Sequence, residues 1–143
     1  MGEISLKIYF CGSILGGRQN AAIYPVIVDH LEDLGHIVLT KHVARLDVLA
    51  FESPRTPQEV YTRDLDWLAE AGAVVAEVTT PSLGVGYEIA VALNLAKPTL
   101  CLYRQGTAVT KLLLGNTSPA ITVRAYATET QLLAMIDVFL QCL

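Results

Sequence analysis

Short runs of almost continuously apolar residues alternate along this chain with segments of helical periodicity. The runs cover residues 6–11, 36–40, 73–78, 98–103 and 121–124. Strands that are apolar on both faces are typical of a parallel sheet that is covered by helices on both sides. Because strand and helix alternate over the whole length, we predict an α/β fold. The prediction is a flavodoxin-like three-layer sandwich with a five-stranded parallel sheet in the order 2-1-3-4-5.

The segments between these runs predict five helices, over residues 18–34, 57–72, 85–95, 107–114 and 128–140. Pro25 lies inside the first of them and should either kink it or mark its first turn. Thr56 has the features of a helix N-cap, because Pro57 follows it and Glu59 completes a capping box. Residues 41–56 show no clear period and end in prolines, so we expect a functional loop there.

The composition limits the classes of function. A chain of 143 residues with 52% hydrophobic side chains suits one domain, over residues 1–143, with a substantial core. Its formal net charge of −4 argues against nucleic acid as a partner, because nucleic-acid-binding surfaces are basic. Its apolar runs are too short to span a membrane, and no signal peptide is recognisable at the start. We expect a cytoplasmic protein, with the nucleus as a second location.

The three cysteines are Cys11, Cys101 and Cys142. They are odd in number and far apart in the sequence, so we expect them to be reduced and buried. No pair of cysteines or histidines has the spacing of metal ligands, and we therefore expect no metal site.

Two glycine-bearing loops should meet at one edge of the sheet, because they follow the first and third strands. Residues 12–18 read Gly-Ser-Ile-Leu-Gly-Gly-Arg, and residues 81–88 read Pro-Ser-Leu-Gly-Val-Gly-Tyr-Glu. Each loop precedes a helix, whose N-terminal N–H groups favour an anion. The residues available to bind it are the donors Ser13, Ser82 and Arg18, together with Gly12, Gly16 and Gly84, where the backbone is bare. A tight turn without a ligand is the alternative, and neither loop has the spacing of a dinucleotide or ATP motif.

Four further residues are candidates for chemistry or for ligand contact. Glu88 begins an apolar helix beside the second loop, where a carboxylate either faces the ligand or stabilises the helix dipole. Asp64 lies on the preceding helix, and its alternative role is that of a solvated carboxylate. Tyr9 ends the first strand as either a site residue or a core residue. His42 follows the second strand as either a polar loop residue or a ligand contact.

These motifs resemble those of a known family. Five segments are similar to motifs of the 2′-deoxynucleoside 5′-phosphate N-hydrolases. They are Tyr9-Phe10-Cys11-Gly12-Ser13, Gly16-Gly17-Arg18, Arg63-Asp64-Leu65, Val75-Ala76-Glu77-Val78 and the 81–88 loop. That group belongs to the nucleoside 2-deoxyribosyltransferase superfamily. The resemblance runs over residues 7–126, and its most specific part is Ser-Leu-Gly-Val-Gly-Tyr-Glu.

The resemblance implies hydrolysis of the N-glycosidic bond of deoxynucleoside monophosphate substrates by a homodimer without a cofactor. Glu88 would be the nucleophile toward C1′ of the deoxyribose, assisted by Asp64 and Tyr9. Two such groups, one nucleophile and one acid and base, are what a retaining glycosidase uses. The 5′-phosphate would be held by the side chains of Ser13 and Ser82 and by the backbone of Gly84.

The resemblance also implies that a hydroxyl group of the neighbouring subunit completes the phosphate site, and Thr110 is our candidate. Ile14 and Tyr9 are candidates for filling the space of a 2′-hydroxyl, which would exclude ribonucleotides. Leu15 departs from the family, which often has a basic residue at this position, whereas Arg18 is retained. The lost cation predicts weaker phosphate binding or a contact that lies elsewhere.

Three other functions fit the same pattern. A nucleoside 2-deoxyribosyltransferase would run the same first step and pass the sugar to a second base instead of water. A non-catalytic nucleotide-binding module would bind a deoxynucleotide and release no base. A flavodoxin-like redox protein would purify yellow, although the sequence has no evident pair of aromatic residues to enclose a flavin.

Overall fold

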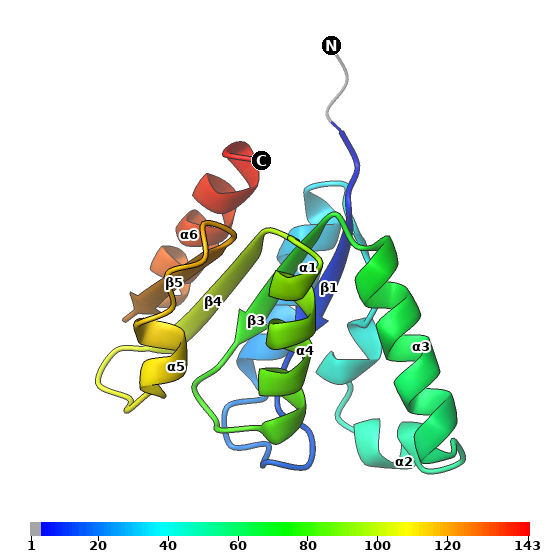
Figure 1. Cartoon of the computed structure of the whole chain (residues 1–143). Helices are drawn as coiled ribbons and strands as arrows, with labels where there is room; N and C mark the ends of the chain where they lie inside the picture. The colour runs from blue at the N-terminus through cyan, green and yellow to red at the C-terminus, as the bar shows by residue number, and fades with distance from the viewer. Residues whose placement is uncertain (1–3) are drawn as a thin grey trace.

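Five parallel strands form one sheet in the order β2-β1-β3-β4-β5 (Figure 1). In the computed structural model, which describes residues 4–143, they are β1 (Lys7–Cys11), β2 (Ile37–Val38), β3 (Ala73–Glu77), β4 (Thr99–Arg104) and β5 (Ile121–Tyr126). β1 pairs with β3 from Ile8↔Ala73 to Cys11↔Ala76. The predicted strand order is therefore confirmed, and so is the α/β class.

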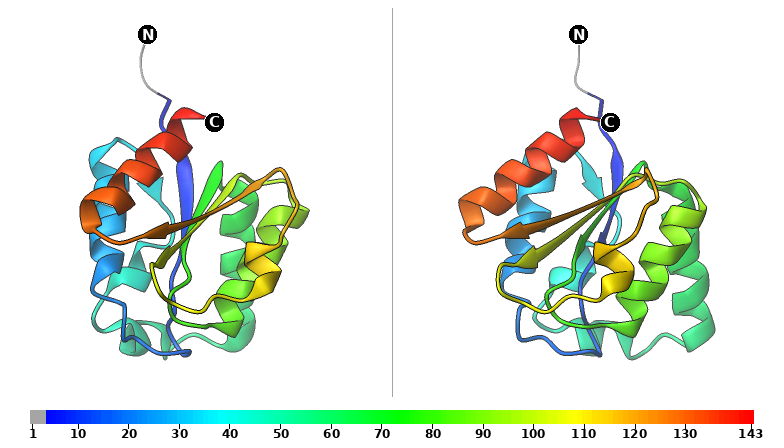
Figure 2. Two further views of the ribbon diagram at one scale, coloured as in Figure 1. Left: turned by 90° about the vertical axis from the view of Figure 1, so that its left-hand side faces the viewer. Right: turned by 60° about the vertical axis from the view of Figure 1, so that its left-hand side comes forward.

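Helices cover both faces of the sheet, as Figure 2 shows. On one face lie α1 (Ile23–Asp33) and α6 (Glu129–Gln141), and on the other lie α3 (Pro57–Glu70) and α4 (Leu83–Asn94). The short helix α5 (Lys111–Leu114) follows β4. The loops that follow β1 and β3 meet at the lower end of the sheet in Figure 1, beside the start of α4.

The alternation of side chains along β1 decides which residues reach which face. Ile8 and Phe10 pack in the core cluster on the α1 and α6 side. Tyr9 and Cys11 pack in the second cluster, with α3 and α4. The strand therefore delivers a tyrosine and a thiol to the same side of the sheet as the helices that carry Asp64 and Glu88. Tyr9 is the middle residue of β1, so the prediction that it ends the strand is wrong.

Several elements are shorter than the sequence predicts, and α5 begins at Lys111 instead of residue 107. α1 begins at Ile23 instead of residue 18, and Pro25 lies in its first turn, where the missing N–H costs nothing. β2 pairs only through Ile37 and Val38, whereas we expected residues 36–40. At Thr40 the hydroxyl replaces backbone pairing, because it accepts from Phe10 N at 2.8 Å and donates to Phe10 O at 2.7 Å.

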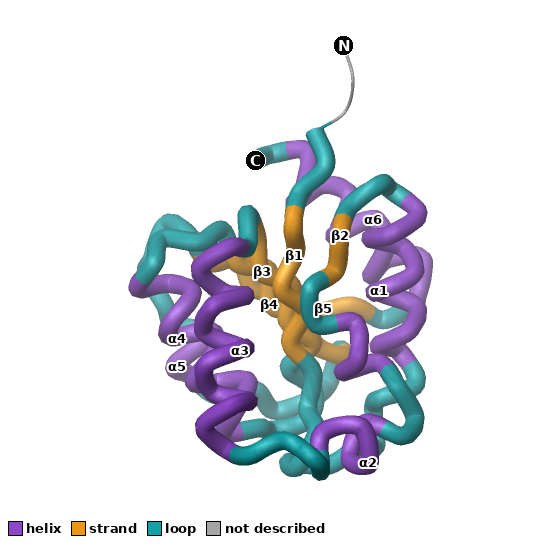
Figure 3. Tube along the Cα trace, turned by 90° about the vertical axis from the view of Figure 1, so that its right-hand side faces the viewer, coloured by secondary structure: helices purple, strands orange, loops and turns teal. Residues whose placement is uncertain are grey.

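Residues 41–56 are not the open loop that their lack of period predicted. They contain a 3₁₀ turn, η1 (Lys41–Ala44), and the one-turn helix α2 (Val48–Glu52), which lies beside the start of α3 (Figure 3). Helices this short cannot show a hydrophobic period in the sequence. Their formation depends on the packing of side chains against the rest of the fold. The guanidinium groups of Arg45 and Arg55 lie over the Phe51 ring, at 4.7 and 4.5 Å from its centroid.

Hydroxyl side chains cap the starts of α3, α6 and α4, and the capping signal predicted at Thr56 is confirmed. Thr56 and Glu59 form the predicted reciprocal capping box at the start of α3. The Thr128 hydroxyl accepts from Gln131 N at 3.2 Å at the start of α6. By contrast, α4 begins at Leu83, two residues earlier than predicted, because the Ser82 side chain caps it by accepting from Val85 N at 3.3 Å.

The structure also tests the predictions about the cysteines and about membrane-spanning segments. Cys11 and Cys101 are buried and free, but Cys142 is exposed, so the prediction that all three are buried is wrong. Cys142 follows the last residue of α6, where no other element covers it. Among residues 4–143, no helix has the length and apolar character needed to cross a bilayer.

Candidate functional site

The two glycine-bearing loops touch each other at the carboxyl end of the sheet. A Cβ atom built on Gly16 would lie 2.4 Å from the Pro81 carbonyl oxygen and 2.9 Å from the Ser13 Oγ. No real side chain tolerates the first distance, so the contact requires glycine at this position. The predicted meeting of residues 12–18 with residues 81–88 therefore occurs, and it depends on a bare backbone.

Ser13 is fully buried between these loops. Its N–H donates to the Tyr24 hydroxyl at 2.9 Å, but its own Oγ has no hydrogen-bond partner within residues 4–143. A buried hydroxyl without a partner costs free energy, and such groups usually have a functional reason. No other protein group among residues 4–143 therefore uses the hydrogen-bonding capacity of this hydroxyl.

Arg18 is placed differently from a free phosphate ligand. Its guanidinium donates to three carbonyl oxygens, those of Ser13 at 2.9 Å, Val43 at 3.0 Å and Arg45 at 2.9 Å. It also lies over the Tyr24 ring, 5.3 Å from the centroid. Arg18 therefore ties the first glycine loop to η1 and brings its positive charge to the loop's backbone.

Glu88 lies on α4, partly buried, facing β1. Burial raises the pKa of its carboxyl from an ordinary 4.5 to about 7, and the negative charge of Asp64 contributes to the rise. Hydrogen bonds from Tyr9 and Cys11 act in the opposite direction and favour the carboxylate. The helix predicted to carry this glutamate thus brings it together with Tyr9 and Asp64, as the sequence suggested.

Asp64 is held by its neighbour in the chain. The Arg63 Nε donates to Asp64 Oδ1 at 2.9 Å, while the same guanidinium makes two hydrogen bonds to Glu52, at 2.8 and 3.1 Å. Burial raises the pKa of Asp64, and Arg63 opposes that rise. Two carboxyl groups with raised pKa values on adjacent helices are typical of a site for acid and base chemistry.

His42 is buried next to this ion pair. Its Nε2 lies 3.2 Å from Glu52 Oε1 and 3.4 Å from Arg63 Nη2, and its ring stacks on Phe51 at a centroid distance of 5.3 Å. Burial, with Arg63 next, lowers the pKa of His42 to about 4, so the ring is neutral at pH 7. It can offer a hydrogen bond at this pH and carries no charge.

Gly84 separates the nucleophile candidate from the second loop's hydroxyl. A Cβ atom built there would lie 3.9 Å from Glu88 Oε1 and 3.9 Å from Ser82 Oγ. The bare backbone of Gly84 thus borders both groups. Ile14 instead packs against the core cluster of the α1 side, and Thr110 is exposed at the start of α5, where its hydroxyl accepts from Leu112 N.

One polar network at this edge was not foreseen from the sequence. Glu77, the last residue of β3, is fully buried and accepts hydrogen bonds from Asn20 Nδ2 at 2.8 Å, Thr79 N at 2.7 Å and the Tyr126 hydroxyl. Arg104 donates to Asn20 Oδ1 in turn. The network joins the ends of β3, β4 and β5 to Asn20, two residues after the first glycine loop. The polar residue inside the apolar run 73–78 was the available signal.

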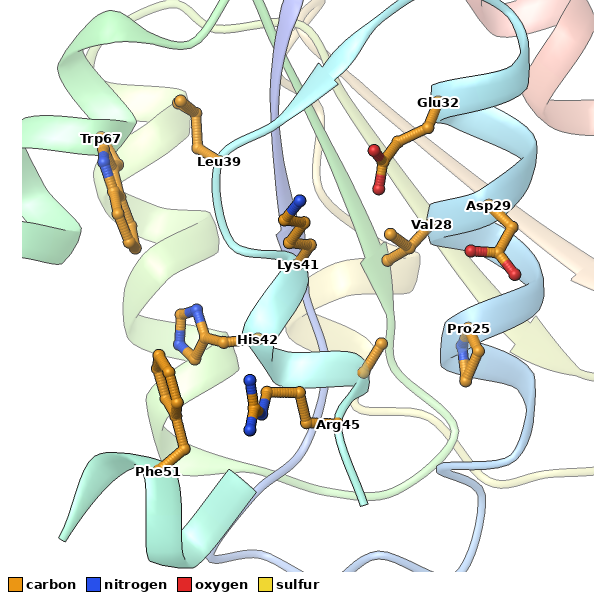
Figure 4. Close-up of a pocket in the computed structure, with 11 residues that line it drawn as sticks. Pro25, Val28, Asp29, Glu32, Leu39, Lys41, His42, Arg45, Phe51 and Trp67 are labelled. Carbon is orange, nitrogen blue, oxygen red and sulfur yellow. The ribbon is translucent and has the colours of Figure 1, made fainter. Parts of the chain in front are cut away.

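A cavity of about 470 Å³ opens next to this site (Figure 4). In Figure 4, Asp29 and Glu32 project from α1 toward Lys41 and Arg45, with His42, Phe51 and Trp67 on the opposite wall. His42 borders the cavity, but none of Tyr9, Asp64 and Glu88 does. Among residues 4–143, no group of three or more His, Cys, Asp or Glu side chains is placed to hold a metal ion.

Known proteins resemble this chain over most of its length. A Methanosarcina mazei protein, named as a candidate 2′-deoxynucleoside 5′-phosphate N-hydrolase 1, is 43% identical over 142 residues, 99% of this chain and 88% of its own. The 5-hydroxymethyl-dUMP N-hydrolase of Rattus norvegicus is 52% identical over 100 residues, 68% of this chain and 61% of its own. The structure of Clostridium botulinum CMP N-glycosidase shares the fold, with a TM-score of 0.68 at 20% identity over 92% of this chain and 98% of that one.

The sequence profile of one family extends over almost all of the elements described above. It matches residues 8–133, from β1 into α6, and its description is nucleoside 2-deoxyribosyltransferase. That range includes both glycine loops and the cluster of Tyr9, Asp64 and Glu88. This chain belongs to the nucleoside 2-deoxyribosyltransferase family.

Proposed function

We propose that this protein hydrolyses the N-glycosidic bond of 2′-deoxynucleoside 5′-monophosphates to free base and 2-deoxyribose 5-phosphate. The observation that carries the proposal is the partly buried Glu88, with its pKa raised to about 7, beside Asp64 and Tyr9 and next to a loop with an unsatisfied serine hydroxyl. The names of the relatives from M. mazei and rat describe the same reaction class.

In the proposed first step, a Glu88 carboxylate oxygen forms a bond to C1′ while the N-glycosidic bond breaks. The electron pair of that bond goes to the base nitrogen, which takes a proton from Asp64. In the second step, water attacks C1′, gives a proton back to Asp64 and releases the Glu88 carboxylate. Tyr9 orients Glu88, because its hydroxyl hydrogen bonds to the carboxylate.

The 5′-phosphate would bind where the two glycine loops meet. The N-terminus of α4 favours an anion, and α4 has twelve residues, so its end carries a substantial dipole. The Ser13 and Ser82 hydroxyls and the backbone of Gly84 supply hydrogen bonds. Arg18 contributes its charge through the loop it holds, and its contacts with carbonyl oxygens suggest an indirect role.

Replacing Ser82 should weaken substrate binding more than it slows the chemistry. In Ser82→Ala we expect KM for the monophosphate to rise about tenfold with a small change in kcat, because uniform binding is lost. The helix cap is lost as well, which costs about 1 kcal/mol of stability. Thr128→Ala is the matched control, since it removes a cap of the same kind from α6 on the other face of the sheet. An unchanged KM in Ser82→Ala would contradict the phosphate role.

A transferase is the second candidate, because the family profile carries that description. Both reactions share the deoxyribosyl-enzyme intermediate and differ in the acceptor. Incubating the purified protein with a panel of deoxynucleoside monophosphates and a labelled second base separates them by chromatography. We expect free base and sugar phosphate as the products. No new nucleotide should carry the label of the second base. Labelled nucleotide as the main product would favour the transferase, and no base release over hours would contradict both.

We also propose a homodimer, in which the Thr110 hydroxyl of the neighbouring subunit reaches the phosphate. Its support is an exposed apolar surface on α3, α4 and α5, formed by Tyr61, Leu83, Tyr87, Leu112 and Leu114. Gly86 and Ala90 are exposed on the same helix α4, so another helix could approach closely. Sedimentation equilibrium should give twice the chain mass of 15.5 kDa, and Gly86→Glu should shift it toward the monomer. A monomer in the unmodified protein at micromolar concentration would contradict this proposal.

A further inference from the structure

Arg63 joins two carboxylates that come from different elements. It donates two hydrogen bonds to Glu52 on α2, from Nη1 to Oε1 at 2.8 Å and from Nη2 to Oε2 at 3.1 Å. Toward its own helix it donates from Nε to Asp64 Oδ1 at 2.9 Å. The guanidinium also lies over the Trp67 ring, 4.9 Å from the centroid. All three nitrogens and one face of this planar group are therefore engaged, and its orientation is fixed.

The surroundings make this pair different from a surface ion pair. The side chains of Arg63, Glu52 and Asp64 are only 18%, 16% and 21% exposed. Exposed pairs contribute little because water screens them, whereas a bidentate arginine in a partly buried place holds its partner firmly. By comparison, the Lys7–Glu70 pair at the other end of α3 has a distance of 3.4 Å and side chains about half exposed.

We propose that Arg63 is the positioning residue of Asp64, and that Glu52 holds Arg63 in the orientation that this requires. The inference rests on the proposed function, in which Asp64 exchanges a proton with the leaving base. A carboxyl group that is free to rotate would present its proton in many directions. Arg63 occupies Oδ1, so that the proton transfers through the remaining oxygen, Oδ2.

The arrangement also explains what residues 41–56 contribute to the site. α2 carries Glu52 and η1 carries His42, and both side chains contact the same guanidinium. The segment therefore reaches Asp64 through Arg63 and makes no direct contact of its own with the carboxyl. When this segment folds against α3, it therefore also orients the Asp64 carboxyl through Arg63.

Arg63 and Glu52 should act on Asp64 with opposite signs. The positive charge and hydrogen bond of Arg63 lower the pKa of Asp64, while the negative charge of Glu52 raises it. The other groups that face this carboxyl are Glu88 on α4 and Tyr9 and Cys11 on β1. None of these is removed when Arg63 is changed, so the Arg63→Gln variant isolates the effect of the guanidinium.

The test is an NMR titration of the Asp64 carboxyl carbon in the free protein, with Asp64→Asn to assign the signal. In Arg63→Gln we expect the midpoint to move to higher pH, because the hydrogen bond and the positive charge beside Asp64 are both lost. An unmoved midpoint would mean that Arg63 only supports the fold, and it would overturn the inference. Glu52→Gln releases the guanidinium, so kcat should fall as in Arg63→Lys, and an unchanged kcat would show that Glu52 does not hold Arg63. Lys7→Gln is the control, because it removes a cation from another carboxylate of α3.

Kinetics give a second reading on the same variants. Arg63→Lys keeps the charge but loses the planar fork, so kcat should fall on the order of ten- to a hundredfold with little change in KM or in the pH profile. Arg63→Gln should lower kcat and also move the pH profile upward. If the unmodified protein releases no base, the proposed function fails, and the NMR titration still decides whether Arg63 sets Asp64. Equal kcat in Arg63→Lys and the unmodified protein would contradict the positioning role.

Discussion

Glu88→Gln should abolish almost all turnover and at the same time stabilise the folded protein above neutral pH. The amide cannot form the bond to C1′, so we expect kcat to fall on the order of a thousandfold or more. The stability gain has a different origin. In the unmodified protein, folding places a carboxylate where burial opposes its charge, which is why the pKa of Glu88 rises to about 7.

The direction of the pH dependence follows from this rise. A carboxyl with a raised pKa in the folded state binds more protons folded than unfolded, so stability falls as pH rises from about 4.5 to about 7. Above that window the charged carboxylate costs about 3 kcal/mol, and the Glu88→Gln change removes this cost. Denaturant unfolding should therefore show a gain of up to about 3 kcal/mol at pH 8, which disappears below about pH 4.5.

Glu70→Gln is the matched control for this experiment. Glu70 is an exposed carboxylate on α3, paired only loosely with Lys7. Its replacement should change stability by less than about 0.5 kcal/mol at either pH and leave turnover unchanged. If Glu88→Gln had the same stability as the unmodified protein at pH 8 and pH 5, Glu88 would not be a desolvated carboxylate. Retained turnover would remove it as the nucleophile.

Gly16→Ala should separate the two glycine loops and so disturb phosphate binding. The added methyl group would meet the Pro81 carbonyl oxygen at 2.4 Å, and backbone must move because that oxygen belongs to no flexible side chain. We expect a loss of about 1 to 3 kcal/mol in stability. We also expect KM to rise tenfold or more, since the loop that carries Ser13 is displaced from the loop that carries Ser82.

Gly72→Ala gives the comparison for this variant. A Cβ atom there would lie 3.2 Å from Leu6 Cδ2, the end of a flexible side chain, at the opposite end of the sheet. Both changes reduce the freedom of the unfolded chain in the same way. Steady-state kinetics should therefore show a raised KM in Gly16→Ala only. If the two variants behaved alike, the contact between the loops would have no part in binding.

The sequence was most informative where a short stretch of residues defines a local structure. The apolar runs predicted the parallel sheet, and Thr56 with Glu59 predicted the start of α3, because a capping box is complete within four residues. The sheet and the cap depend on short-range pattern and on topology alone. The grouping of Glu88 with Tyr9 was implied by the family resemblance, and the two side chains meet in the structure from the middle of β1 and the first half of α4.

The features that were missed depend on contacts between distant residues. Glu52 and Arg63 are eleven residues apart, and nothing in the aperiodic stretch 41–56 indicates that a one-turn helix would bring them together. In the same way, the exposure of Cys142 depends on what fails to pack on the end of α6. Arg18 was predicted as a charged ligand from its place beside the loop, and its three carbonyl partners emerge only in the folded structure.

The buried Glu77 network has a consequence for the speed and cost of substrate capture. It anchors Thr79, two residues before the second glycine loop, and Asn20, two residues after the first, from within the sheet. Loops that are ordered before the ligand arrives lose little conformational entropy when it binds. The amide of Thr79 should accordingly exchange with deuterium at a rate close to that of the central strands, with or without a nucleotide. Substrate capture would then be a docking event onto a finished surface, with no loop left to fold.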